Sequence, residues 1–318
     1  MRVHFLVLAH EHAPAVWRLA DRLAAEPGAS VSVHWDSSTS APLAPPGLDV
    51  VVHSSPAPSG WGTGAQLDAA IAALRSVAGQ PFDWLVLLSG SCYPIRPPAQ
   101  LAAFLDTTPH LAFLETHAHG PVPPPTDTSE PLTYLQRRYF VRYRWVPTWL
   151  WRRLPAPAAH GAEVALQRSV RACTPEREVW VQRRPRAGAP GIGRRIRRHP
   201  FSATRPCRTG SDWFALARPV YDDLLAQLAA EPALVEHFRR TFCPNEALFH
   251  TLVLPRWEHA NAGHNLHHRH MGPTEPHPTV LRDADWDAMV ASGRFLARKF
   301  DPADRRLLDR IDHELLGR

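Results

Sequence analysis

Short apolar runs alternate with segments of helical spacing over the first hundred residues, and this alternation constrains the fold more than any other feature. Parallel strands need a crossover connection, usually a helix, so the pattern predicts an α/β fold with a mainly parallel sheet flanked by helices. Apolar residues three and four apart mark the helices, and Val- and Leu-rich runs mark the strands. The expected strands are Val3–Ala9, Val31–Asp36, Val50–His53, Trp84–Leu88 and Leu111–Glu115, and the expected helices are Ala15–Ala25, Gln66–Val77 and Ala99–Leu105.

One of these strands runs directly into a polar turn. The apolar run Trp84–Leu88 suits a strand buried on both faces, and the residues Ser89–Cys92 follow it without a break. Open parallel sheets bind their ligands in the crevice beyond the carboxyl ends of such strands. Taken alone, the stretch is equally compatible with a structural turn and with a ligand site.

Bulk composition indicates a globular protein. The 318 residues, 44% of them hydrophobic, can form one large α/β domain or two smaller ones. No segment approaches the roughly 20 apolar residues that cross a bilayer, and Met1–His10 is too short and too soon polar for a signal peptide. The four cysteines are scattered without paired spacing, which favours free thiols and a cytoplasmic location.

The positive charge is concentrated in an insertion. The formal net charge is +6, and much of the excess lies in arginines between Arg137 and Arg205, a pattern compatible with nucleic acid, a membrane surface or nucleotide phosphates. The Pro-rich stretch 120–125 cannot continue a helix or a central strand and starts the insertion. Over 134–153 aromatic residues and arginines interleave, and Arg183–Arg198 adds a second basic tract. A solvated amphipathic helix with a loop, an acceptor-binding surface and a surface for peripheral membrane contact all remain open.

Ordered patterns return after the insertion. The segment Gly210–Leu216 precedes an expected helix at Pro219–Ala229. Phe242–Leu252 is typical of a loop entering a helix, with Asn245 as a possible cap and Glu246 in the first turn. Two further helices are expected at Ala284–Ser292 and Asp304–Leu316.

Five ordered segments together resemble the core-2/I-branching β-1,6-N-acetylglucosaminyltransferases and the peptide O-xylosyltransferases. They are His34-Trp35-Asp36, Trp61-Gly62, Leu88–Ile95, Gly210–Leu216, and Pro244-Asn245-Glu246 with Ala297-Arg298-Lys299-Phe300 downstream. They span most of the chain except about Gly120 to Cys207. The resemblance implies a GT-A-like glycosyltransferase fold with a Rossmann-like sheet in a single domain, in which 1–116 binds the nucleotide, 117–207 is the Pro/Arg-rich insertion and 208–318 is the acceptor and catalytic half.

The same resemblance implies an inverting, metal-independent, bacterial-type glycosyltransferase. Its donor is a UDP-sugar, with UDP-N-acetylglucosamine as the first choice and UDP-xylose as the second, and no cofactor is expected. The acceptor is a hydroxyl of a glycan or small molecule. Two other classes stay open: a catalytically silent sugar-binding protein, and a nucleic-acid-binding protein, for which no recognised motif is present.

The resemblance assigns Glu246 as the catalytic base. Direct displacement at an anomeric carbon needs a group that takes the proton of the acceptor hydroxyl, and a carboxylate suits that task. Without the resemblance, Glu246 is better interpreted as a helix-start carboxylate that complements the helix dipole. Asn245 stands where the family has Asp, which removes one neighbouring negative charge.

Lys299 matches the lysine of the family that binds the donor diphosphate, and Arg298 lies beside it. A cation at the departing phosphate stabilises the negative charge that develops there. The alternative is a pair of surface cations near a helix. A second family arginine should lie upstream, with Arg269 and Arg282 as candidates.

Further contacts follow from strand-end positions and from the resemblance. Nucleoside binding is expected from His10, Asp36 and Trp61, and sugar or acceptor binding from Ser89, Gly90, Ser91, Cys92 and Trp213. Each is also a common packing or capping residue. The family usually carries Asp where this chain has Cys92, so either that acid is structural or the substrate choice differs here.

Three patterns resemble metal-binding motifs, but their positions and spacing do not favour a metal site. Asp283-Ala284-Asp285 spells the manganese motif of other sugar transferases but starts a C-terminal helix instead of following a strand of the nucleotide half. The run of histidines from His259 to His270 lacks Cys and the His-Glu-x-x-His pattern, and His10-Glu11-His12 is too short to close a site. No metal site is therefore predicted.

Overall fold

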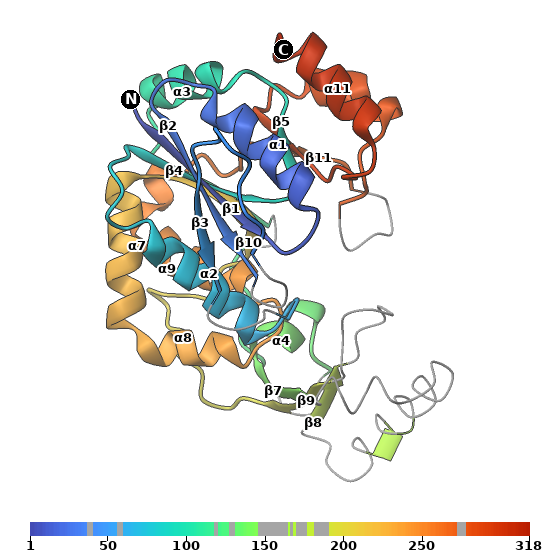
Figure 1. Ribbon diagram of the computed structural model, residues 1–318. Coiled ribbons are helices and arrows are strands. Elements are labelled where there is room, and N and C mark those ends of the chain that lie inside the picture. Colours follow the sequence, from blue (N-terminus) through green and yellow to red (C-terminus); the bar gives the residue numbers. More distant parts are fainter. Residues whose placement is uncertain are drawn as a thin grey trace.

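A six-stranded sheet forms the centre of the computed structural model, which describes residues 1–36, 41–55, 60–117, 120–126, 131–145, 165, 168–169, 177–180, 191–271 and 278–318 (Figure 1). The strand order is β3-β2-β1-β4-β10-β6. Its strands are β1 (Val3–Ala9), β2 (Ala29–Trp35), β3 (Val51–Ser54), β4 (Trp84–Ser89), β6 (Ala112–Thr116) and β10 (Gly210–Ala217). Only β10 runs against its neighbours β4 and β6, so the predicted mainly parallel α/β sheet is confirmed.

Helices cover both faces of this sheet. Along β1 the side chains alternate, so Phe5 and Val7 belong to one buried cluster and Leu6 to the other. The first cluster receives α1 (Ala13–Ala24), α3 (Pro98–Thr107), α10 (Trp286–Ala291) and α11 (Arg305–Glu314). The second receives α2 (Gly64–Ser76), α7 (Arg218–Ala230), α8 (Pro232–Arg239) and α9 (Asn245–Trp257). None of the helices in the described part of the chain combines the length and apolar character needed to span a membrane.

A second, three-stranded sheet brings the C-terminal part of the chain to the end of β4. Strand β5 (Cys92–Pro94) follows β4 after a short turn and pairs with β12 (Leu296–Arg298), which pairs in turn with β11 (His267–Arg269). In this register Arg298 lies opposite Cys92 on one side and opposite Arg269 on the other. Strands of three residues carry too little periodicity for the sequence to predict, and all three were missed.

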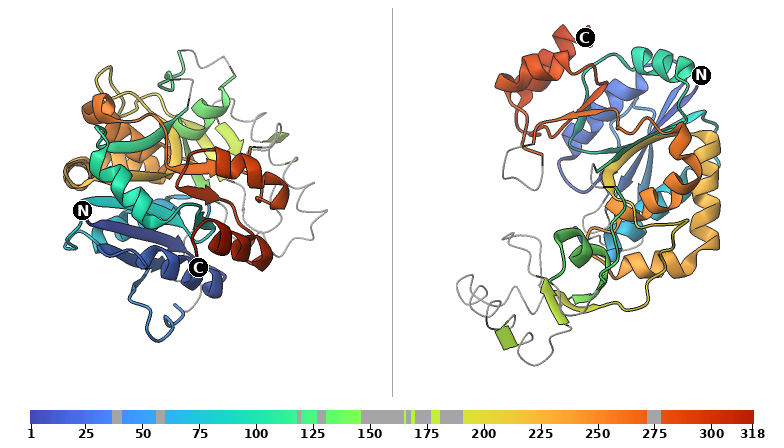
Figure 2. Two further views of the ribbon diagram at one scale, coloured as in Figure 1. Left: turned by 90° about the horizontal axis from the view of Figure 1, so that it is seen from above. Right: turned by 180° about the vertical axis from the view of Figure 1, so that it is seen from behind.

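The insertion contributes a helix and a small antiparallel sheet. Helix α4 (Tyr134–Tyr139) is followed by β7 (Val141–Trp145), which pairs with β9 (Gly191–Arg195), and β9 pairs with β8 (Arg177–Trp180). In both Figure 1 and the right view of Figure 2 this sheet lies at the opposite end of the protein from α11.

The structure contradicts the solvated amphipathic helix predicted as one alternative for the insertion. The solvated amphipathic helix does not run through the described part of 134–153, because α4 ends at Tyr139 and a strand follows. Tyr139 and Phe140 are fully buried, so the start of this segment packs into the protein. Residues 146–153, which belong to the predicted membrane contact, lie outside the described residues.

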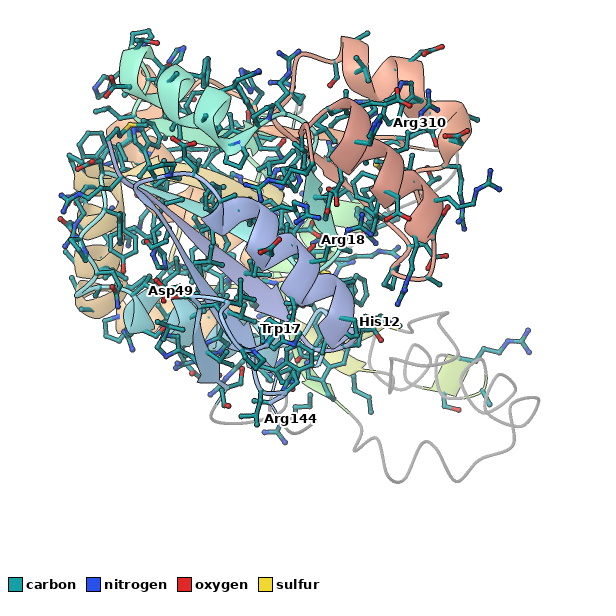
Figure 3. All side chains as sticks on the ribbon, turned by 45° about the horizontal axis from the view of Figure 1, so that its top comes forward. His12, Trp17, Arg18, Asp49, Arg144 and Arg310 are labelled. Atoms are coloured by element: carbon teal, nitrogen blue, oxygen red, sulfur yellow. The ribbon has the colours of Figure 1, made fainter. Side chains whose placement is uncertain are left out.

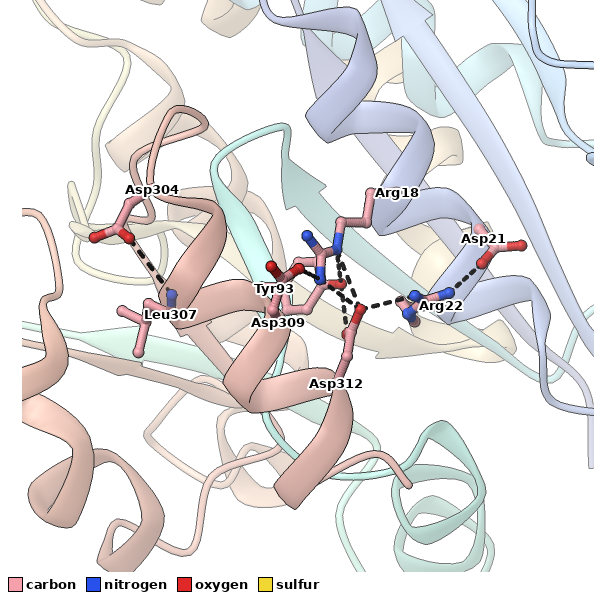
Figure 4. Close-up of polar contacts among 8 residues, drawn as sticks. All are labelled: Arg18, Asp21, Arg22, Tyr93, Asp304, Leu307, Asp309 and Asp312. Atoms are coloured by element: carbon pink, nitrogen blue, oxygen red, sulfur yellow. Dashed lines mark hydrogen bonds and ion pairs between the residues drawn. The ribbon is translucent and has the colours of Figure 1, made fainter. Parts of the chain in front are cut away.

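The last helix is held to the first by a buried carboxylate. Asp312 of α11 accepts hydrogen bonds of 2.7 Å from Arg18, Arg22 and the Tyr93 hydroxyl (Figure 4). Figure 3 shows Arg18 on α1 on the side that faces α11. Because Tyr93 belongs to β5, this network also fixes the strand that follows the Ser89–Ser91 turn.

Candidate active site

The predicted nucleoside-binding residues follow neighbouring parallel strands at one edge of the sheet. His10 comes directly after β1, and Asp36 comes directly after β2. The backbone amide of Asp36 donates to the Ala9 carbonyl over 2.8 Å, so the two strand ends lie side by side. Asp36 is buried, whereas His10 is exposed beside Glu11. The strand ends thus place both residues at the edge where open parallel sheets bind ligands.

Trp61 lies on a turn that contacts the loop before the candidate base. The Cys243 amide donates to the Gly62 carbonyl over 2.9 Å, and the Trp61 ring meets Phe242 edge-on with ring centroids 5.5 Å apart. Gly62 has φ +75°, and a Cβ there would lie 2.6 Å from the Phe242 ring. Only glycine satisfies both the backbone conformation and the close approach.

Glu246 lies in the first turn of α9, as predicted, and an arginine of the insertion holds it. The Arg138 guanidinium donates to Glu246 over 2.7 Å, and its side chain is 5% exposed against 25% for Glu246. Three aromatic rings surround this guanidinium, those of Tyr134, Tyr139 and Phe242. A charge-assisted bond of this kind orients a carboxylate that solvent still reaches.

A second carboxylate shares this site. Asp212 of β10 has a buried Oδ1 without a hydrogen-bond partner in the described part of the protein. Burial, with a smaller contribution from the negative charge of Glu246, raises the pKa of Asp212 to about 7, while Arg298 and Arg138 oppose the rise. Asp212 therefore keeps its proton to a higher pH than an ordinary aspartate does.

The cations predicted to bind diphosphate lie at the end of β12. The Arg298 guanidinium stacks over the Trp213 ring, 4.9 Å from its centroid, and Trp213 itself is 8% exposed. The residue after Lys299, Phe300, donates its amide to the Ser91 carbonyl over 3.0 Å. Lys299 thus lies beside the turn that follows β4, although it is far away in the sequence. The role of Trp213 as a sugar platform stays a prediction, and Arg298 covers its ring here.

The turn after β4 is tied together by its own side chains. The Ser89 and Ser91 hydroxyls are 2.9 Å apart, and Cys92 Sγ accepts from the Ser89 amide over 3.4 Å. Cys92 is 2% exposed and belongs to a buried hydrophobic cluster, and its role in sugar or acceptor binding stays a prediction. Gly90, on the same turn, packs against Val16 of α1, where a Cβ would come within 3.0 Å.

The structure separates the two candidates for the second arginine. Arg269 is the register partner of Arg298 and forms an ion pair with Glu115, at the end of β6. Arg282 is half-exposed and pairs with Asp301 and Asp304 at 3.5 and 3.4 Å. Only Arg269 lies among the charged groups around Glu246: the pKa of nearby His117 is lowered mainly by burial, and Glu246, Arg138, Glu115 and Arg269 all act on it.

The sequence did not single out several of these residues: Arg138, Asp212, Glu115 and His117. A signal for α4 was available, because Thr133 and Gln136 form a capping box, with the Gln136 amide donating to the Thr133 hydroxyl over 3.2 Å. That signal starts the helix at Tyr134 and puts Arg138 on it, but it gives no contact with Glu246.

The patterns set aside as metal sites have other partners. Asp285 accepts hydrogen bonds from the Arg282 amide and from His270, while Asp283 pairs with Arg310. Within the described ranges, no group of three or more His, Cys, Asp or Glu side chains is arranged to hold a metal ion.

Comparisons with known proteins add little. No family model matches this sequence, and none of the curated proteins matches it. Among solved structures, the apo form of mouse xyloside xylosyltransferase 1 is similar over 82% of this chain and 84% of that one, with 11% identity and a TM-score of 0.32. A similarity this low carries no functional conclusion.

Proposed function

We propose that this protein is an inverting glycosyltransferase of GT-A-like fold that moves a sugar from a UDP-sugar to an acceptor hydroxyl. The observation that carries the proposal is the Glu246 site, where a partly exposed carboxylate held by Arg138 shares its surroundings with Asp212 and Arg298. A base and a group of cations in one site are what such a displacement needs. The five segments that resemble the core-2/I-branching and xylosyltransferase family include Glu246, Asp212, Arg298 and Lys299.

The proposed donor lies across the carboxyl ends of the parallel strands. Asp36, at the end of β2, accepts a hydrogen bond from the nucleoside, and His10 and Trp61 complete that side of the pocket. Arg298 and Lys299 bind the diphosphate beside the Ser89–Ser91 turn, and Arg269 is the second arginine because it lies next to Arg298 in β11.

In the proposed reaction Glu246 takes the proton of the acceptor hydroxyl. The acceptor oxygen then attacks the anomeric carbon, and the bond from that carbon to the phosphate oxygen breaks with inversion. UDP leaves with the electron pair, and Lys299 and Arg298 stabilise its charge. Arg138 keeps Glu246 oriented toward the acceptor, and Asp212 adds a second polar group beside it. No metal ion has a role in this scheme.

UDP-N-acetylglucosamine is the proposed donor, with UDP-xylose as the alternative, and the direct test is UDP release. The purified protein is assayed with both donors and a panel of glycan and small-molecule acceptors, in the presence and absence of EDTA. We expect acceptor-dependent UDP release that EDTA does not reduce. Complete loss of activity on chelation, restored by Mn²⁺, would refute metal independence.

The Glu246→Gln variant tests the base, because glutamine keeps the shape and loses the proton acceptor. We expect turnover to fall by about 10²–10⁴-fold while UDP still stabilises the protein against heating. Near-normal turnover would remove Glu246 from the mechanism. UDP-sugar binding without transfer in the wild type would instead favour the silent sugar-binding class.

A further inference from the structure

A polar cavity of about 320 Å³ lies next to the candidate active site. Its lining includes Glu115 and Arg269, whose charges already belong to the active-site group. The remaining lining residues come from the loop before β11, from β11 itself and from the loop before β12. The volume is within the range of small-molecule sites.

Along the strand order of the central sheet, this cavity lies on the side opposite to His10 and Asp36. The central sheet runs from β3, β2 and β1 at one side to β6 at the other. His10 and Asp36 follow β1 and β2, whereas Glu115 belongs to β6. Asp212 lies between the two in the strand order, because β10 is the neighbour of β6. A molecule in the cavity would therefore lie on the side of Asp212 away from His10 and Asp36.

The charge of the lining is positive. Arg269 is neutralised by its ion pair with Glu115, but Arg294 has no carboxylate partner within the described part of the chain. Arg294 donates to His264 Nδ1 over 2.5 Å and to the Asn265 carbonyl over 3.3 Å. His264 Nδ1 also lies 2.9 Å from the Asn265 carbonyl, which can only accept, so these contacts do not assign one tautomer to His264. The lining thus offers a cation beside an imidazole.

His267 is a buried polar residue in the wall of this cavity. It lines the cavity, is 6% exposed, and neither ring nitrogen has a hydrogen-bond partner in the described part of the protein. Burial, and then the charges of Arg298 and Arg269, lower the pKa of His267 to about 3, so the ring is neutral with one N–H donor. Buried polar groups are nearly always hydrogen-bonded, and both ring nitrogens are buried behind the cavity surface, so His267 makes the wall more polar without itself contacting a bound molecule.

The cavity is also held in shape. The side-chain Nδ2 of Asn265 donates to the Ser211 hydroxyl over 3.1 Å, and the side-chain Oδ1 of Asn265 accepts from the His267 backbone amide over 3.0 Å. Ser211 directly precedes Asp212 on β10. The loop before β11, which contains the Asn265 carbonyl that accepts from Arg294, is therefore fixed to β10, the strand that carries Asp212.

We propose that this cavity binds the acidic group of the acceptor, so that the acceptor is a sugar or glycan carrying a carboxylate, phosphate or sulfate. The proposal rests on the function proposed above, and it gives the histidine run a role in anion binding. Arg294 is the principal cation, with His264 and His268 around it, while Arg269 is paired with Glu115 and belongs to the proposed donor site.

Calorimetric binding to the whole protein tests this inference with defined probes. Glucuronate, glucose 6-phosphate and glucose 6-sulfate represent the three acidic groups, and glucose is the neutral reference. We expect at least one acidic probe to bind more tightly than glucose, and Arg294→Gln to weaken it about tenfold. Arg294→Lys, which keeps the charge, should retain part of the affinity. Arg240→Gln, at an exposed arginine of the loop after α8, is the matched control and should bind as the wild type does.

UDP affinity, measured on the same variants, separates this proposal from the proposed function. We expect UDP to bind the wild type and Arg294→Gln equally. Weaker UDP binding by Arg294→Gln would assign the cavity to the donor and overturn the acceptor proposal. Equal binding of acidic and neutral probes, or unchanged acidic-probe binding in a folded Arg294→Gln variant, would overturn it as well. Absence of UDP binding in the wild type would instead refute the proposed function, while anion binding could still be measured.

Discussion

Arg138 and Glu246 are 108 positions apart in the sequence and form a 2.7 Å charge-assisted hydrogen bond in the structure. Arg138 comes from the insertion and Glu246 from the helix that carries the candidate base. The Arg138 side chain is 5% exposed, so its charge is desolvated and Glu246 is the carboxylate that compensates it. The insertion therefore contributes a buried residue, Arg138, to the candidate site.

Replacing Arg138 tests whether this contact positions the base. We expect Arg138→Gln to lower kcat by about 10²-fold, because small misplacements of a reacting group have effects of that size. The KM for the UDP-sugar should change little, since the donor cations are untouched. The free energy of unfolding should fall by about 2 kcal/mol through the lost buried ion pair.

Steady-state kinetics and thermal unfolding check this prediction. Arg144→Gln, at an exposed arginine of β7, is the control and should leave kcat unchanged. If Arg138→Gln raised KM for the donor and left kcat unaltered, Arg138 would not position the base.

The raised pKa of Asp212 should make the free energy of unfolding fall as pH rises. Its pKa is raised above that of the unfolded chain, so the folded protein binds an extra proton between about pH 4 and about pH 7. Stability from this group is greatest at low pH and falls as pH rises through that window. Asp212→Asn removes the titration, so at pH 8 the variant should be more stable than the wild type by about 2 kcal/mol.

Urea unfolding at several pH values between 4 and 8 measures this effect. Asp106→Asn, at an exposed carboxylate of α3, is the control and should follow the wild-type curve. A wild-type minus Asp212→Asn difference that stayed constant across the range would show that the Asp212 pKa is not raised.

The sequence predicted the parallel part of the fold well, because each strand there is followed by a helix or turn within a few residues. It could not predict β10 between β4 and β6, since a strand does not record its neighbours and more than 90 residues separate β10 from β6. Arg269 beside Arg298 depends on pairing between three-residue strands. Arg138 depends on a tertiary contact across the insertion, where no local pattern applies. The sequence therefore yields candidate site residues within segments that have a local pattern, such as Glu246, and misses residues such as Arg138 that contact them from other segments.

Gly62 should tolerate no side chain, because its φ of +75° and its distance to Phe242 both exclude a Cβ. We expect Gly62→Ala to lower the free energy of unfolding by about 2 kcal/mol. Activity should fall as well, because Gly62 accepts from Cys243 in the loop that leads to Glu246. Gly79→Ala is the control, since a Cβ there meets nothing within 4 Å. Equal thermal stability of the two variants would contradict the close packing of Gly62.

Asp312 shows the opposite pH behaviour from Asp212. Burial opposes its ionisation, but hydrogen bonds from Arg22, Tyr93 and Arg18 outweigh burial and lower its pKa. Its stabilisation is therefore present above about pH 4 and lost as pH falls below the ordinary range of an aspartate. Asp312→Asn should cost about 3 kcal/mol at pH 7, because it leaves two arginines without their buried carboxylate.

The difference between wild type and Asp312→Asn should shrink as pH falls, because protonation makes the wild-type side chain resemble asparagine. Chemical unfolding at pH 7, 5 and 3 measures this convergence. Asp309→Asn is the matched control, since Asp309 also pairs with Arg18 but is 66% exposed, and it should change stability by less than about 1 kcal/mol. Parallel curves for wild type and Asp312→Asn down to pH 3 would mean that the network linking α1, β5 and α11 does not depend on the charge of Asp312.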